Sequence, residues 1–207
     1  MEYHTTDANQ IIADDRVGLV YIGTRHNLHA GLATRALMAG KHVLCEKPVA
    51  MTLAELAGLM HAARTSGKLL SAGYNRRYSP HASRLKAALA DRPRMMIYTV
   101  NTGRIAADHW TLDPIQGGGR LIGEADHFFD FMNFMAGGEP LEVSAHALIR
   151  AGESARSQLN FFVTVTFSDG SRGTLLYTDL GGASFPRERV EVFAGGSVHV
   201  IEDFKHY

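Results

Sequence analysis

The feature that most constrains the fold is a regular alternation of short apolar segments with amphipathic segments over residues 1–78. An order of strand, helix, strand with short connections requires right-handed crossovers and a parallel sheet. Continuous apolar runs, rather than alternating ones, are typical of parallel strands that are covered on both faces. The sequence predicts strands at residues 17–23, 42–45 and 69–73, and helices at residues 7–14, 28–39 and 52–66.

Two of these helices carry end signals. Asn27 is positioned to cap the helix over residues 28–39. Thr52 and Glu55 have the spacing of a capping box, and Gly67 follows at the expected end of that helix. We therefore predict an α/β protein that begins with a partial Rossmann-like parallel sheet.

The second half of the chain has a different pattern. Long strand-like segments follow one another, and Ser168 to Ser171 and Gly195-Gly196 have the composition of hairpin turns. We predict a partial dinucleotide-binding domain over residues 1–78 and an α+β domain with a large, mainly antiparallel open sheet over residues 79–207. The predicted strands lie at residues 94–100, 141–150, 158–167, 171–179, 187–193 and 198–202, and the helices at residues 80–90 and 120–135.

Composition limits the classes of partner. Hydrophobic residues make up 45% and charged residues 20% of the chain, which is typical of a globular protein. The 21 basic and 21 acidic residues balance, so nothing favours binding to nucleic acid or to an anionic membrane. No apolar run approaches the roughly 18 residues of a membrane span. Cys45 is the single cysteine, which excludes an internal disulfide and favours a cytoplasmic protein that handles a small molecule.

The first half lacks one expected part. A dinucleotide-binding domain opens with a strand, a G-x-G-x-x-G loop and a helix whose N-terminus holds the pyrophosphate, and no such segment occurs here. The strand at residues 17–23 resembles a middle strand of such a sheet, and as a free edge it would favour association. We expect that the chain lacks the N-terminal third of a nucleotide-binding fold.

Glu46-Lys47-Pro48 follows the predicted strand at residues 42–45. Ligands of open α/β sheets bind at the carboxyl ends of strands, and Pro48 holds Lys47 out of the helical region. A lysine in this place can polarise a hydroxyl or carbonyl group and, when desolvated, can move protons. The structural alternative is a solvated turn with a surface ion pair.

Residues 24–29 occupy the equivalent place after the first strand, where the start of a helix favours anions. His26 and His29 have the spacing of a metal pair, but a zinc site needs three or four ligands and no others cluster nearby, so we predict no metal. The structural alternative makes Asn27 a cap and His29 a packed, hydrogen-bonded side chain.

A third segment combines Gly117-Gly118-Gly119 with a helix on which Glu124, His127 and Asp130 share one face. His127 suits general acid–base chemistry, and a neighbouring carboxylate can orient its ring. The alternative is a buried structural histidine on an acidic helix start. Trp110, before the glycines, either stacks on a sugar ring or anchors a core.

Taken together, these segments resemble the Gfo/Idh/MocA oxidoreductases, the relatives of glucose–fructose oxidoreductase and inositol dehydrogenase. Residues 24–29 and 39–48 resemble the signature TPxxxH followed by AGKHVxxEKP. Residues 71–78 resemble the GxNRRF stretch between that family's two domains, and residues 117–130 resemble its GGGxxxDxGxHxxD motif. The resemblance covers nearly the whole chain in the right order and spacing. It also implies further strand and helix after Tyr207, so we expect a truncation at the C-terminus as well.

The resemblance implies an NAD(P)-dependent dehydrogenase or reductase that acts on a sugar, cyclitol or related polyol. It assigns catalysis to Lys47, with His127 as the proton carrier. It implies a homodimer or higher homo-oligomer formed through the C-terminal sheet. The implied cofactor-binding residues are Thr24, His26, Asn27, His29, Glu46, Lys47 and Pro48, and the candidate substrate-binding residues are Asn75, Arg76, Arg120, His127 and Trp110.

Two departures from the family pattern matter. Arg25 replaces a proline, and the motif aspartate falls on Gly123, so Glu124 becomes the third candidate catalytic residue. Without the glycine-rich loop we expect impaired NAD or NADP binding, because several charge-assisted hydrogen bonds of about 1.5–3 kcal/mol each are lost. A non-catalytic oligomerisation module and a sugar-binding module stay open as alternatives. The enzyme hypothesis requires Lys47 and His127 to converge on one pocket.

Overall fold

The computed structural model describes residues 3–89, 92–149 and 159–207. The chain divides into two compact units. The first contains Met1–Gly73 and Pro114–Gly118, and the second contains Tyr74–Asp113 and Gly119–Tyr207. A short segment from the second half of the sequence, Pro114–Gly118, thus belongs to the first unit. The division into a partial dinucleotide-binding domain over residues 1–78 and an α+β domain over residues 79–207 stays a prediction. The predicted element ends at residues 90, 150 and 158 lie outside the described residues.

The first unit is built on a parallel sheet with the strand order β1-β2-β3, as the alternating pattern predicted. Its core contains buried apolar side chains from strands and helices, among them Ile22, Ala33, Leu37, Val43 and Leu59. Its strands are β1 (Leu19–Ile22), β2 (His42–Cys45) and β3 (Leu70–Ala72), and its helices are α1 (Ala8–Ala13), the 3-10 turn η1 (His26–Leu28), α2 (His29–Met38) and α3 (Leu53–Ser66).

Strand β1 is the part of this unit that the sequence misjudged. Among the described residues β1 pairs only with β2 and lies at the edge of the sheet, as the missing glycine-rich segment led us to expect. The prediction that both faces of the strand are covered is wrong. Leu19 and Tyr21 are 58% and 59% exposed, whereas Ile22 is buried. The apolar run therefore predicts the position of the strand correctly, but it does not predict how much of the strand's side-chain surface is buried.

The helix-end signals had mixed outcomes. The capping box is confirmed: the Glu55 amide donates to Thr52 Oγ1 at 3.1 Å, and the Thr52 amide donates to Glu55 Oε2 at 3.1 Å. Gly67 ends α3 with φ of 64°. The predicted Asn27 cap is wrong, because Asn27 lies inside the 3-10 turn and Leu28 is the residue that precedes α2.

The second unit contains a six-stranded sheet with the order β5-β6-β7-β4-β8-β9. Every neighbouring pair is antiparallel except β4 and β7, which are parallel. The predicted turns join β6 to β7 and β8 to β9. The strands are β4 (Met95–Asn101), β5 (Pro140–Ala147), β6 (Phe161–Phe167), β7 (Arg172–Thr178), β8 (Glu188–Ala194) and β9 (Ser197–Glu202).

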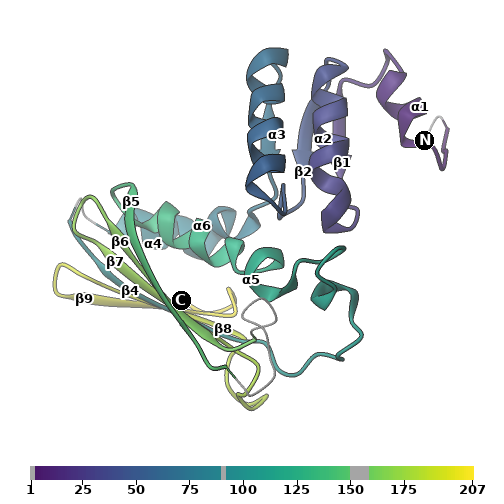
Figure 1. Ribbon diagram of the computed structural model, residues 1–207. Helices are drawn as coiled ribbons and strands as arrows, with labels where there is room; N and C mark the ends of the chain where they lie inside the picture. The colour runs from purple at the N-terminus through teal and green to yellow at the C-terminus, as the bar shows by residue number, and fades with distance from the viewer. Residues whose placement is uncertain (1–2, 90–91, 150–158) are drawn as a thin grey trace. The chain divides into compact units, whose positions relative to one another are not determined.

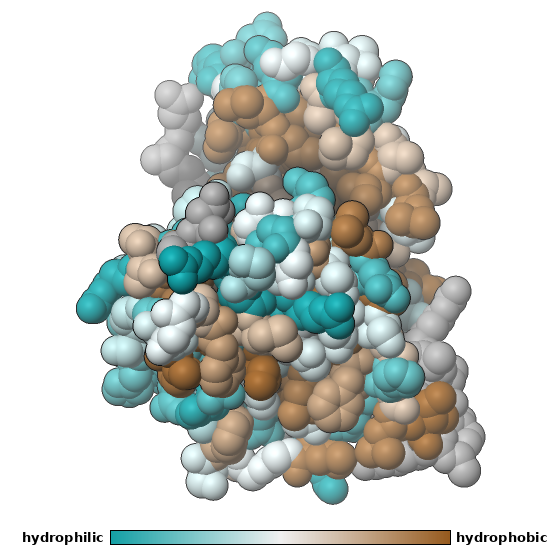
Figure 2. Space-filling model, turned by 90° about the vertical axis from the view of Figure 1, so that its left-hand side faces the viewer, coloured by the Kyte–Doolittle hydropathy of each residue, from teal (hydrophilic) through white to brown (hydrophobic). Residues whose placement is uncertain are grey.

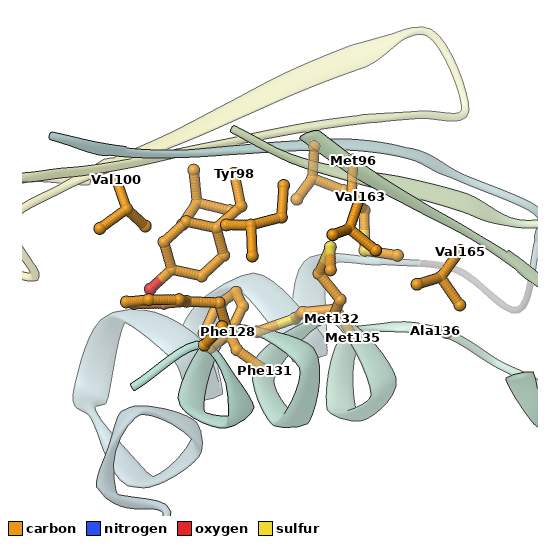
Figure 3. Close-up of a cluster of buried hydrophobic side chains, with 14 of the residues drawn as sticks. Met96, Tyr98, Val100, Phe128, Phe131, Met132, Met135, Ala136, Val163 and Val165 are labelled. Atoms are coloured by element: carbon orange, nitrogen blue, oxygen red, sulfur yellow. The ribbon is translucent and has the colours of Figure 1, made fainter. Parts of the chain in front are cut away.

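The helices of this unit lie on one face of the sheet (Figure 1). The predicted helix over residues 120–135 is two helices, because the α-helical conformation is interrupted at Glu124 and Ala125. Figure 3 shows aromatic and methionine side chains of α6 pointing toward the strand residues above them. The helical elements are η2 (Asn75–Tyr78), α4 (Pro80–Ala88), η3 (Trp110–Leu112), α5 (Gly119–Gly123) and α6 (Asp126–Met135).

Helix α6 is held at its face and at its C-terminus. The Tyr98 ring of β4 lies 4.9 Å from the Phe128 ring and 5.6 Å from the Phe131 ring, both edge-on. Lys86 Nζ and Arg94 Nη1 donate to the Met135 carbonyl, and positive groups at this helix end also complement the helix dipole. These contacts give the residues at the start of α6 a rigid support. No helix in the described part of the chain is long and apolar enough to cross a membrane.

Candidate active site

The first cluster lies in the first unit, where strand β2 ends. The Lys47–Pro48 peptide bond is cis. The neighbouring Glu46 side chain accepts a hydrogen bond from the Tyr21 hydroxyl at 2.9 Å, which raises the pKa of Tyr21. Gly73, just after β3, leaves room for this carboxylate, since a Cβ there would lie 2.8 Å from Glu46 Oε2. Glu46 is thereby fixed between two strand ends, and it anchors the backbone that carries Lys47.

His29 connects the end of β2 with the end of β1. Its ring is 1% exposed. Nδ1 lies 2.8 Å from the Pro48 carbonyl oxygen, and Nε2 lies 3.0 Å from the Thr24 carbonyl oxygen. Both ring nitrogens therefore face the main chain. His29 was predicted to line a cofactor cleft, and this geometry assigns its polar atoms to the protein backbone.

His26 attaches the glycine segment to the same cluster. Its Nδ1 lies 2.8 Å from the Gly117 carbonyl oxygen. Burial lowers the pKa of His26 below the ordinary value, and the Lys47 charge contributes in the same direction, so the ring is held neutral and Nδ1–H donates. Arg25 also donates to the Gln116 side chain. Apart from the glycines themselves, no local sequence pattern indicates this pairing.

Three side chains at these strand ends offer donors to a ligand. Thr24 and Asn27 are exposed and Lys47 is half-buried. Hydroxyl, amide and ammonium groups at the carboxyl edge of a parallel sheet suit the hydroxyls and phosphates of a nucleotide. The described residues contain no group of three or more His, Cys, Asp or Glu side chains that could hold a metal ion.

The second cluster lies in the second unit and centres on Glu124. Its carboxylate accepts from Arg120 Nη1 at 2.7 Å, from Arg187 Nη2 at 2.9 Å and from the Tyr177 hydroxyl. Burial, with the neighbouring carboxylate charge, raises the pKa of Tyr177 well above its usual range. Three donors on one carboxylate stabilise its charged form, so this environment favours a fixed acceptor over a proton donor.

His127 is buried in the first turn of α6, and its backbone amide donates to Asp126 Oδ1 at 2.9 Å. The Tyr74 ring stands edge-on at 6.1 Å from the His127 ring. Burial and the nearby Asp126 charge raise the pKa of Tyr74, which keeps this phenol protonated. Asp130, predicted to flank the histidine, forms an ion pair with Arg77. That Glu124 or Asp130 orients the His127 ring stays a prediction.

The candidate substrate residues have diverse environments. Arg76 forms an ion pair with Glu188 inside the second unit, and Arg120 is paired with Glu124. Asn75 is exposed at the start of η2, and the half-buried Trp110 ring stacks on His109 at 6.1 Å. The tie of Arg76 to Glu188 points to a structural role, while Asn75 keeps its polar group accessible.

A pocket of about 430 Å³ lies beside α6. Its polar lining consists of the Tyr74, Asp126, Asp130 and Asn133 side chains. His127 is not among the residues that line it. The apolar lining consists of Phe129, Pro140, Val143, Val163, Val165 and Phe167.

Comparison with known families gives two matches along the chain. Residues 2–74 match a family model described as an oxidoreductase family with an NAD-binding Rossmann fold. Residues 86–195 match a model described as the GFO/IDH/MocA C-terminal domain. The second match alone covers more than half of the chain, and the two follow each other in the order of the two structural units.

Curated relatives are dehydrogenases and oxidoreductases. An uncharacterized oxidoreductase of Bacillus subtilis, YrbE, is 27% identical over 197 residues, which cover 93% of this chain and 58% of the relative. A 1-carboxy-3-chloro-3,4-dihydroxycyclohexa-1,5-diene dehydrogenase of Comamonas testosteroni is 31% identical over 83% of this chain and 45% of its own length. The myo-inositol 2-dehydrogenase of Thermotoga maritima is 27% identical over 90% and 57%. The chain thus spans about half the length of the relatives it matches.

Solved structures show the same fold. An oxidoreductase domain protein from Kribbella flavida has a TM-score of 0.80 at 26% identity, covering 95% of this chain and 58% of that one. The WlbA dehydrogenase of Bordetella pertussis, solved with NADH and UDP-GlcNAcA, has a TM-score of 0.83 at 18% identity, covering 97% and 60%. At these identities the likeness to WlbA concerns the fold.

Proposed function

Because the chain belongs to the GFO/IDH/MocA oxidoreductase family, we propose that it carries the hydride-transfer site of an NAD(P)-dependent dehydrogenase or reductase that acts on a sugar, cyclitol or related polyol. The observation that carries this proposal is the fixed end of β2. Tyr21 holds Glu46, and His29 lies against the Pro48 carbonyl, so the backbone on both sides of Lys47 is anchored. Such rigidity is required of a group that must act at a defined position.

For the cofactor, we propose contacts with the strand-end side chains. The donor set of Thr24, Asn27 and Lys47 fits ribose hydroxyls and phosphate oxygens, since all three offer hydrogen-bond donors and are exposed or half-buried. Bound NAD(H) would accept or supply the hydride. His26 and His29 have a supporting role in this proposal, because each ring lies within hydrogen-bond distance of a backbone carbonyl.

For the chemistry, we propose that Lys47 polarises the reacting oxygen and that His127 carries the proton. In the oxidative direction the alcohol loses its O–H proton to the imidazole of His127 and its C–H hydride to the cofactor, leaving a carbonyl group. An imidazole side chain suits this role near neutral pH. Glu124 serves as a charge partner that holds Arg120 and Tyr177, and Asn75 and Trp110 remain proposed substrate contacts.

We propose that the 207-residue chain assayed by itself binds NAD(H) weakly. The chain contains no G-x-G-x-x-G loop, and the backbone N–H groups of such a loop usually hold the pyrophosphate. A fluorescence titration with NADH, followed by NADH production with a panel of polyols, tests both parts. Weak saturable binding with slow turnover is expected. Micromolar binding would overturn the weak-binding proposal, and saturable binding without turnover of any polyol or sugar would overturn the hydride-transfer proposal.

The outer face of the large sheet supports a second candidate function, a homodimerisation or oligomerisation module. The register of the strands places five apolar side chains with 40–57% exposure on the face opposite α6. On the side of the molecule that Figure 2 presents, brown apolar side chains lie among teal and white ones. The side chains are Met95, Ile97, Phe162, Phe193 and Val198.

Sedimentation separates the two candidates. If the parent chain is a homodimer that Ile97→Glu dissociates, and the parent chain shows NADH-dependent turnover, the result fits an oligomeric enzyme. A homodimer with no cofactor or polyol response fits a module without catalysis, and a polyol that raises the melting temperature without NAD fits a sugar-binding module. The single buried thiol, Cys45, is consistent with the cytoplasmic location that we propose.

A further inference from the structure

We propose that Arg187 is a specificity residue that binds a carboxylate group of the substrate, so that the site takes a sugar acid rather than a neutral polyol. Arg187 directly precedes strand β8, and its guanidinium contacts the Glu124 carboxylate between α5 and α6. The His127 amide donates to the Glu124 carbonyl at 3.2 Å, so this contact lies one helical turn from the proposed proton carrier. The role of Arg187 rests on the function proposed above, because it concerns the substrate of the same site.

The charges around Glu124 do not cancel. Its carboxylate is shared by two guanidinium groups, with Arg187 Nη2 at 2.9 Å from Oε1 and Arg120 Nη1 at 2.7 Å from Oε2. Guanidinium groups stay protonated in proteins, so these three side chains together keep one positive charge. Within the described ranges of the chain neither arginine has a second carboxylate partner. A ligand with one negative charge would complete the balance.

Two other arginine pairs of the second unit are complete by comparison. Arg76 donates to Glu188 through both Nε and Nη2, and Arg77 donates to Asp130 in the same way. In each pair one guanidinium engages both oxygens of one carboxylate, which is the strongest geometry for these groups. Glu188 follows Arg187 in the sequence, but its carboxylate is already matched by Arg76. The positive charge at Arg187 therefore stays uncompensated by its neighbour.

Arg187 keeps hydrogen-bond donors for a ligand. Its contact with Glu124 is made by Nη2, and its Nη1 lies at the long distance of 3.4 Å from the Thr102 carbonyl oxygen. Its Nε–H makes no hydrogen bond with any residue that the structure describes. The side chain is 51% exposed, so a ligand can reach it. A planar guanidinium with free N–H groups suits a carboxylate, which accepts two parallel hydrogen bonds.

Arg120 contributes charge rather than contact. Its side chain is 13% exposed, and its Nε is a buried N–H without a hydrogen-bond partner among the described residues. Buried donors of this kind are uncommon, and this one belongs to the group of side chains whose charge is not balanced. Glu124, which also accepts from the Tyr177 hydroxyl, holds both guanidiniums in place. One remaining positive charge matches a carboxylate better than a phosphate ester, which carries close to two negative charges at neutral pH.

Calorimetric titration of the full chain tests the ligand class. The probes are glucose, galactose and mannose, each compared with its uronate and with its primary phosphate ester. We expect at least one uronate to bind about tenfold or more tightly than the neutral sugar and the phosphate of the same configuration, with an affinity that falls as salt is added. Binding of no uronate, or equal binding of uronate and neutral sugar, would overturn the proposal. Preference for a phosphate would overturn the assignment to a carboxylate.

Variants test whether Arg187 carries the preference. Arg187→Gln removes the charge, Arg187→Lys keeps the charge without the planar group, and Arg172→Gln removes an exposed arginine of β7 as the control. We expect Arg187→Gln to lose the preference for the uronate while its affinity for the neutral sugar stays unchanged. Arg187→Lys should recover part of the preference, and Arg172→Gln should keep all of it. A parent-like preference in Arg187→Gln would refute the role of Arg187.

Melting temperatures show whether the variants fold. If Arg187→Gln does not fold, Arg187→Lys decides, because an undiminished preference for the uronate in that variant would contradict recognition by a guanidinium. The substrate class and the proposed function fail differently. Uronate binding that depends on Arg187, without hydride transfer to or from the cofactor, would keep the anion site and remove the enzyme function. Turnover of neutral polyols at equal rates in the parent and in Arg187→Gln, without preference for a uronate, would do the reverse.

Discussion

The Arg76 guanidinium is paired with Glu188, 112 residues away in the sequence, with Nε donating to Oε2 at 2.7 Å. The same carboxylate accepts from the Tyr98 hydroxyl at 2.6 Å. The Arg76 and Glu188 side chains are only 15% and 11% exposed, and Arg76 Cζ lies 4.9 Å from the Phe128 ring centre. One side chain of η2 is thus joined to β8, β4 and α6 within the second unit.

Replacing Arg76 is expected to destabilise the second unit strongly. Arg76→Ala leaves Glu188 buried without its cation, and breaking a buried pair in this way costs about 3–5 kcal/mol. Denaturant unfolding of Arg76→Ala and of the exposed control Arg104→Ala gives the comparison. Equal unfolding free energies for the two variants would show that Arg76 is not structural and would return it to the candidate substrate residues.

The capping box of α3 gives a smaller prediction. Thr52→Ala removes the acceptor for the Glu55 amide, and loss of such a cap costs about 0.5–2 kcal/mol. Thr65→Ala, an exposed change in the last turns of the same helix, is the matched control and is expected to have little effect. Thermal unfolding followed by circular dichroism measures both. A stability loss in Thr65→Ala as large as in Thr52→Ala would contradict the capping role.

Local signals in the sequence predicted most of the helices and strands, but not which segments pack against them. The β2 strand and the α3 helix agree with their predicted residues, because a short apolar run and a capping box are local features. The break between α5 and α6 was missed, since the apolar periodicity continues through it. The parallel pairing of β4 with β7, inside an otherwise antiparallel sheet, depends on contacts between distant segments that no local pattern reports.

In the candidate site, too, local features of the sequence were predicted correctly, whereas contacts between distant residues were not. The segments that carry Lys47 and His127 were found from motif spacing, and their places after β2 and on α6 agree with the predicted elements. The partners of Glu124 were not found, because Tyr177 and Arg187 lie 53 and 63 residues away and reach it only through the sheet. The family pattern made Glu124 a candidate catalytic residue, whereas its three hydrogen-bond donors favour a charged acceptor.

The buried His26 side chain is expected to make the free energy of unfolding depend on pH. Burial lowers its pKa in the folded chain below the ordinary 6.5, so the unfolded chain takes up a proton first as the pH falls. The stability that the neutral ring contributes is therefore present above about pH 6.5 and is lost below it. His26→Gln is expected to lose less stability than the parent chain between about pH 7.5 and about pH 5.5, while His61→Gln follows the parent. Identical slopes for His26→Gln and the parent would contradict a neutral His26.

Cys45 is expected to be unreactive in the folded chain. The thiol is fully buried, and burial, with a smaller effect of the Glu46 charge, raises its pKa to about 12. Since the thiolate is the nucleophile, iodoacetamide should modify Cys45 slowly in the native chain and rapidly in denaturant. Mass spectrometry of the two samples measures the difference. Equal labelling rates would show that the thiol is accessible and would reopen a reactive role.

The last prediction concerns Lys47, which is proposed to polarise the reacting oxygen, and His127, which is proposed to carry the proton. Lys47→Ala and His127→Ala are each expected to lower kcat/KM for the polyol by about 10²–10⁴-fold, the range typical of a positioned acid–base group. Exposed residues of the same types, changed in Lys205→Ala and His61→Ala, are the controls, and melting temperatures check that all variants fold. If both groups act on one transfer step, the double variant should lose far less than the product of the single losses, because each single change already disables that step. Fully multiplicative losses would mean that Lys47 and His127 act in separate steps, and near-parent turnover in either single variant would remove that residue from catalysis.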